Sequence, residues 1–102
     1  MRIQIHAQDP ELPPEFREFA EGRLSETLEY LSEHLTLVEV HMKDTNGQKR
    51  GIDKRCVIEA RPRGMDPIAV EHDAAHAQDA LIKASEKLKN ALTSRLGRRA
   101  AR

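Results

Sequence analysis

Residues 73–99 read DAAHAQDALIKASEKLKNALTSRLGRR, and the rest of the chain is organised around this stretch. Apolar side chains recur in it at steps of three and four residues, which place them on one face of an α-helix. They are Ala74, Ala77, Leu81, Ala84, Leu88, Leu92 and Leu96. Aspartate often caps the start of a helix, as Asp73 could here. Glycine often ends a helix, as Gly97 could here. The spacing therefore predicts a helix bounded by Asp73 and Gly97, with one face packed on a core.

The other faces of this predicted helix are basic. Seven basic residues from residue 83 onward accompany a single acid, Glu86, which leaves an excess of six positive charges. They are Lys83, Lys87, Lys89, Arg95, Arg98, Arg99 and Arg102. Basic residues in the last turns complement the helix dipole, so a plain solvated terminal helix explains the pattern equally well. The sharper interpretation is a helix that packs on a sheet and presents its basic side to a polyanion.

Composition indicates one small domain whose charge is unevenly distributed. The chain has 102 residues, of which 38% are apolar and 33% charged, as expected of a small α+β domain with one core. Its formal net charge is zero, yet residues 9–39 hold nine acids and two arginines, an excess of seven negative charges. Such segregation favours an anionic partner for the basic end of the chain.

The three aromatic residues, Phe16, Phe19 and Tyr30, all fall in one predicted helix. We expect each of them to be buried or half-buried there. Base stacking on aromatic residues of a sheet, as RNA-recognition motifs perform it, is therefore not expected.

The remaining segments predict the order β-α-β-β-β-α. The alternation of residues and the turn formers indicate strands at 2–6, 37–43, 54–61 and about 68–70, a helix at about 14–34, and a mobile hairpin loop at 44–53. The economical packing is a four-stranded, mainly antiparallel sheet with both helices on one face, an α+β fold like that of a double-stranded-RNA-binding domain. We expect one domain at 1–97 and a disordered basic tail at 98–102.

Catalytic and metal chemistry find little support in the pattern. Cys56 is the only cysteine, which excludes an intramolecular disulfide, and its inward position in a strand indicates an inert thiol. His72 and His76 lie four residues apart, but the expected cap at Asp73 leaves His72 outside the helix. We expect no enzyme activity, cofactor, metal or small-molecule substrate. Without a membrane-spanning run or a signal peptide, the expected location is the cytoplasm.

Several stretches resemble the ribosome hibernation promoting factors, the family that includes ribosome-associated inhibitor A (protein Y). Met1 to Ile5 resembles the first strand of that family, and Glu15 to Phe19 followed by Arg23-Leu24 resembles its first helix. Ala80 to Lys83 and Lys87 to Leu92 resemble its last helix. The resemblance covers nearly the whole chain, although the outer side of the first helix is acidic here and often basic in the family.

The resemblance implies a translation inhibitor that binds the small ribosomal subunit in the mRNA–tRNA channel during stress. The basic residues would contact phosphates of ribosomal RNA, and a ribosomal protein is a further possible contact. The expected contacts are Lys83, Lys87, Lys89, Arg95, Arg98, Arg99 and Arg23, with Lys49, Arg50, Lys54 and Arg55 from the hairpin loop. The alternatives are a non-enzymatic protein-interaction regulator that binds no RNA and, third, a small enzyme.

Overall fold

The computed structural model describes residues 1–7, 12–45 and 54–100. Their elements are β1 (Arg2–Ala7), α1 (Glu15–Thr27), the 3-10 helix η1 (Glu29–His34), β2 (Leu35–Asp44), β3 (Lys54–Pro62), β4 (Ile68–Ala74) and α2 (Ala77–Ala100). Leaving aside the short η1, this is the predicted order β-α-β-β-β-α, and the predicted α+β fold is confirmed.

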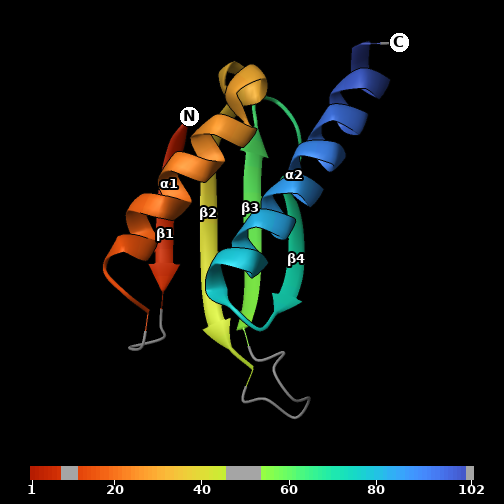
Figure 1. Cartoon of the computed structure of the whole chain (residues 1–102). Helices are drawn as coiled ribbons and strands as arrows, with labels where there is room; N and C mark the ends of the chain where they lie inside the picture. Colours follow the sequence, from red (N-terminus) through yellow and green to blue (C-terminus); the bar gives the residue numbers. More distant parts are fainter. Residues whose placement is uncertain (8–11, 46–53, 101–102) are drawn as a thin grey trace.

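The four strands form one sheet in the order β1-β2-β3-β4. β1 runs parallel to β2, whereas β2 with β3 and β3 with β4 are antiparallel. A parallel pair needs a crossover between its strands, and α1 with η1 forms it. Both helices lie on one face of the sheet, with α2 crossing it diagonally and its last turns continuing past the strands (Figure 1).

The core lies between the sheet and the two helices. Alternate residues of β2 and β3 point into it, because successive side chains of a strand face opposite ways. The fully or almost fully buried side chains include Val38, Val40, Met42, Cys56, Ile58 and Ala60 from these strands, Phe16, Ala20 and Leu24 from α1, and Leu81, Ala84, Leu88 and Leu92 from α2. Among the described residues no element covers the opposite face of the sheet, which we call the open face (Figure 1).

The first helix is shorter than the predicted span of 14–34. It ends at Thr27, and Leu28 leaves α-helical geometry with φ −102° and ψ 14° before η1 begins. Tighter 3-10 winding is common where a helix ends, and here it brings the chain into β2. The expectation that Tyr30 is buried or half-buried is wrong, because its position in η1 leaves it 89% exposed.

The last helix starts later and ends later than the sequence predicts. Asp73 is not the residue that directly precedes the helix: it lies in β4 opposite Arg55 of β3 and forms a cross-strand ion pair with it. The helix begins at Ala77 and continues through Gly97 to Ala100, so Gly97 does not close it. Ala74 accordingly belongs to β4 and not to the helical stripe. The division of the chain at residue 97 stays a prediction.

Most of the predicted hairpin loop lies outside the described residues. Residues 46–53, which include Lys49 and Arg50, are not among them. Across the described ranges, no helix combines the length and apolarity needed to cross a membrane.

Two helical glycines allow a direct test of the helix boundaries. A Cβ atom added at Gly22 of α1 or at Gly97 of α2 would meet no heavy atom within 4 Å. Glycine inside a helix is less favourable than alanine by about 0.5–1 kcal/mol. We expect Gly22→Ala to raise the free energy of unfolding by about that amount, and Gly97→Ala to raise it by less, because terminal turns fray. Urea denaturation measures both changes. A loss of stability in Gly97→Ala would indicate that the helix ends there.

Candidate nucleic-acid interface

The basic residues of α2 fall mainly along one side of the helix. At 100° per residue, Lys83, Lys87 and Arg98 lie within about 60° of one another around the helix axis. All three are exposed. Arg95 lies on the same side but closer to the core, and it is half-buried. We call these four residues the basic strip. It extends about 22 Å along the helix, at a rise of 1.5 Å per residue.

Backbone carbonyls beside the helix anchor the middle of this strip. Lys87 Nζ donates to the carbonyl oxygen of Glu71 in β4 at 2.9 Å, and an Arg95 amino group donates to the carbonyl oxygen of Asp66 at 2.7 Å. Asp66 belongs to the turn between β3 and β4. The strip therefore runs along the β4 side of α2, at the edge of the sheet remote from β1.

The two ends of the strip make local contacts within the helix. Lys83 Nζ lies 3.7 Å from Glu86 Oε2, with both side chains more than half exposed. Arg98 donates to Ser94 Oγ at 2.7 Å. Exposed pairs of this kind contribute little to stability, so both cations can exchange these partners for a phosphate at small cost.

Other residues expected at the same interface are not brought to the strip. Lys89 is exposed, but it lies about 160° around the helix from Lys87. Arg23 is half-buried on α1. The side chain of Arg99 lies outside what the structure describes, as do Lys49 and Arg50.

Lys54 and Arg55 begin β3 and point to opposite faces of the sheet. Lys54 is on the helix side, with 13% of its side chain exposed and Nζ 3.8 Å from Asp44 Oδ2. Arg55 is on the open face, where it donates to both carboxylate oxygens of Asp73 at 2.8 and 3.0 Å. This hydrogen bonding, together with the charges of Asp73 and Glu71, raises the pKa of the Arg55 guanidinium. Each of the two residues thus pairs with an acid of a neighbouring strand.

The surface of α1 has the opposite charge to the basic strip. Its exposed acids, continued into η1, are Glu15, Glu18, Glu21, Glu26, Glu29 and Glu33. α1 and α2 pack side by side on the same face of the sheet (Figure 1). The helical layer is therefore acidic on the α1 side and basic along the β4 side of α2.

Comparison with protein families identifies the chain. Residues 3–100 match the model of the family described as Sigma 54 modulation protein / S30EA ribosomal protein. The chain belongs to the S30EA ribosomal protein family. This confirms the resemblance to the ribosome hibernation factors. The comparison with curated proteins finds no match.

Solved structures share the S30EA fold with this chain. A ribosomal subunit interface protein from Coxiella burnetii superimposes with a TM-score of 0.78 at 15% identity, covering 95% of this chain and 99% of that one. The N-terminal domain of Protein Y from Thermus thermophilus has a TM-score of 0.67 at 21% identity, covering 88% and 93%. At these identities the similarity establishes the fold alone.

S30EA proteins are generally non-enzymatic, and the cysteine of this member is buried in the core, as its inward position in a strand predicts. Cys56 is fully buried in β3. Burial raises the pKa of its thiol to about 12, because the charged thiolate is poorly solvated there. His72 lies in β4, outside α2 as expected, and His76 is exposed just before the helix.

The sequence interpretation missed one group of side chains on the open face. His6 of β1 lies beside Glu39 and His41 of β2, with possible ligand atoms of all three within 4.8 Å of one another. The pattern Glu-Val-His at residues 39–41 was a usable signal, since alternate strand residues share a face. The position of His6 was not deducible without the parallel pairing of β1 with β2.

The buried thiol gives a test of the core around β3. We expect Cys56 to react with a disulfide reagent at pH 8 only as the chain opens, because roughly one thiol in ten thousand is ionised at that pH when the pKa is near 12. Labelling of the native protein should be slower by orders of magnitude than labelling in 8 M urea, which serves as the control. Equal rates in the two conditions would show that Cys56 is accessible in the folded chain.

Proposed function

We propose that this S30EA chain is a hibernation factor that binds the small ribosomal subunit in the mRNA–tRNA channel and silences translation under stress. The observation that carries the proposal is the basic strip: four cations along one side of α2, exposed at both ends and free of the acids that cover α1. Membership of a ribosome-associated family supports the ribosome as the partner. Such a protein would act in the cytoplasm.

The chemistry of the strip suits recognition of phosphates better than recognition of bases. Phosphate contacts supply affinity without sequence information, whereas readout of RNA bases generally uses stacking on aromatic side chains. Among the described residues, the only strongly exposed aromatic ring is that of Tyr30, on η1. Arg95 and Arg98 can bind a phosphate with two parallel hydrogen bonds, and Lys83 and Lys87 add point charges. Double-helical RNA presents such phosphates in a fixed array.

The acidic side of the helical layer restricts how the protein can bind. Phosphates would be repelled by the six exposed acids of α1 and η1, so the β4 side of α2 would face ribosomal RNA. α1 would then face away from the RNA or towards a basic ribosomal protein. Exposed Tyr30 between Glu29 and Glu33 favours such a protein contact, because tyrosine is enriched at protein interfaces. The same surface would serve the alternative function, a protein-interaction regulator that binds no RNA.

Co-sedimentation with purified small subunits and whole ribosomes tests the proposal. We expect binding at low salt that falls steeply as salt rises, because each phosphate contact releases counterions, and we expect competition by tRNA or mRNA. A chain that stays in the supernatant at every salt concentration contradicts ribosome binding. Binding that is insensitive to both salt and competitors contradicts the proposed channel and the phosphate contacts.

A pair of double variants tests the strip itself. Lys83→Gln with Lys87→Gln removes two charges from the strip and should weaken ribosome binding, lowering the slope of log K against log salt by about 0.7–0.9 for each phosphate that is no longer neutralised. Arg2→Gln with Lys43→Gln removes the same charge from exposed positions on the open face and is the matched control. Equal weakening in both variants would mean that net charge, and not the strip, determines binding.

A further inference from the structure

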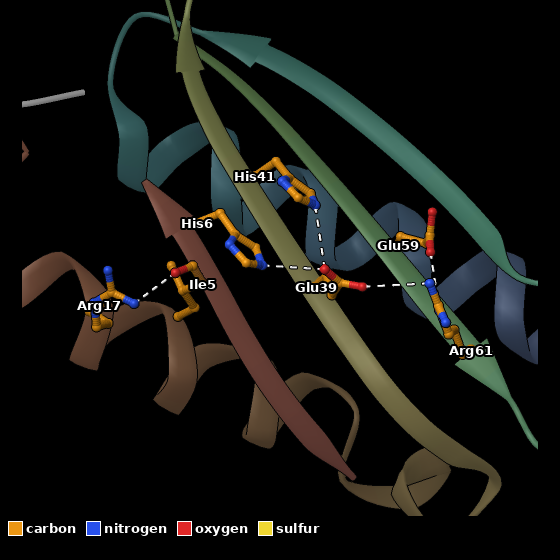
Figure 2. A network of polar contacts seen from close by, with 7 residues as sticks. All are labelled: Ile5, His6, Arg17, Glu39, His41, Glu59 and Arg61. Atoms are coloured by element: carbon orange, nitrogen blue, oxygen red, sulfur yellow. Dashed lines mark hydrogen bonds and ion pairs between the residues drawn. The ribbon is translucent and has the colours of Figure 1, made fainter. Parts of the chain in front are cut away.

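Two histidines and a glutamate converge on the open face of the sheet, on the side away from the basic strip. His6 Nε2 lies 3.3 Å from Glu39 Oε2, and His41 Nε2 lies 3.9 Å from the same oxygen (Figure 2). The side chains are 45%, 46% and 20% exposed for His6, His41 and Glu39 respectively. The group is therefore half open to solvent, with its carboxylate the most enclosed member.

The parallel pairing of β1 with β2 produces this convergence. His6 is the register partner of His41, so the two side chains leave adjacent strands on the same face. Their rings stack with centroids 4.7 Å apart and 10° between the planes, a separation that matches the spacing of paired strands. Glu39 precedes His41 by two residues and so projects from the same face of β2. The pairing of the two strands therefore fixes the Cα positions from which all three side chains project.

These atoms are of the kinds that bind transition-metal ions. Two imidazole nitrogens and one carboxylate oxygen are ligands that Zn²⁺ binds at about 2.0–2.2 Å. In a tetrahedral site with such bonds, neighbouring ligand atoms lie roughly 3.3 Å apart, as His6 Nε2 and Glu39 Oε2 already do. We propose that His6, Glu39 and His41 bind one divalent first-row transition ion such as Zn²⁺, with a fourth position open to water.

The surroundings of Glu39 resemble the outer shell of a metal site. Its second oxygen, Oε1, lies 3.8 Å from Arg61, and Arg61 Nε donates to Glu59 Oε1 at 3.4 Å (Figure 2). Partners of this kind orient a carboxylate ligand. Glu59 also offsets the charge of Arg61, which would otherwise repel a cation. Lys43 lines a pocket on this face together with His6 and His41, but its side chain is exposed and can turn towards solvent.

Binding requires a small movement of the two rings. A metal ion prefers to lie near the plane of each imidazole that binds it, and two stacked rings cannot both meet that condition. The rings must open towards a common ion, which their exposure allows without disturbing the core. An ion held in this way would link the edge strand β1 to β2 through side chains. It would stabilise the folded chain by an amount that rises with the logarithm of the ion concentration once that exceeds the dissociation constant.

The test is a Zn²⁺ titration of the chain prepared without a histidine tag. We expect one ion per chain by calorimetry, together with a rise in the melting temperature. Nitrogen chemical shifts of the imidazole rings should change for His6 and His41 and stay constant for His34, His72 and His76. Binding with shifts confined to other histidines, or no binding, overturns the proposal.

Single substitutions locate the ligands. His6→Gln, His41→Gln and Glu39→Gln should each weaken Zn²⁺ binding by about tenfold or more, since even outer-shell partners of metal ligands are worth 10–100-fold. His34→Gln is the matched control, because His34 Nε2 lies 3.6 Å from Glu33 Oε1 in an exposed pair that has one imidazole only. Unchanged affinity in the three ligand variants, or an equal weakening in His34→Gln, rejects the site. Ribosome binding is not a readout here, so the proposed function and the metal site fail independently.

Discussion

Burial of the apolar side of α2 against β3 and β4 is the interaction on which the rest of the structure depends. Leu81, Leu88 and Leu92 leave no exposed surface, and each such side chain contributes about 1.5–3 kcal/mol when fully buried. This packing, together with that of α1, determines which face of the sheet is buried. One face becomes the core, and the other stays open and polar. Because the apolar side of α2 faces the sheet, its basic strip faces solvent along β4. The amphipathic pattern of this one helix therefore determines both the packing of the core and the position of the exposed cations.

A neutral chain can still carry a strongly polarised surface when its charges are sorted by element. α1 and η1 present acids, the β4 side of α2 presents cations, and several charges of the open face pair across strands. Arg55 illustrates the third group: its guanidinium is committed to Asp73 on the neighbouring strand. A basic residue in the sequence is thus available to a partner only where the fold leaves its charge uncommitted or weakly paired.

Periodicity alone predicted most of the fold. Alternation located β2 and β3 and their inward residues, and the steps of three and four located the buried side of α2 from Leu81 onward. The errors lie at the ends of elements, where local signals compete with tertiary contacts. Asp73 is a good helix cap by residue type, yet its pairing with Arg55 keeps β4 extended to Ala74. Gly97 is a typical terminator, but nothing near it obliges the helix to stop.

The candidate sites were less predictable, because they depend on which strands become neighbours. The sequence marks the cations of α2, and helical geometry separates Lys89 from Lys83 and Lys87 once the helix is accepted. Alternation already puts Lys54 and Arg55 on opposite faces of their strand, but it does not show that each pairs with an acid of a neighbouring strand. His6 and His41 are 35 residues apart in the chain. Only the parallel register of β1 with β2 places them side by side.

The hydrogen bond from Lys87 to the carbonyl of Glu71 also bears on self-association. β4 is an edge strand, and exposed edges are templates on which a strand of another molecule can pair and start aggregation. An ammonium group on an edge carbonyl occupies one acceptor of that template and places a charge where an incoming strand would lie. Lys87 would therefore protect the free protein from edge-to-edge pairing. In the proposed complex, a phosphate would bind the ammonium group of Lys87. The bound RNA would then cover the edge of β4 that Lys87 protects in the free protein.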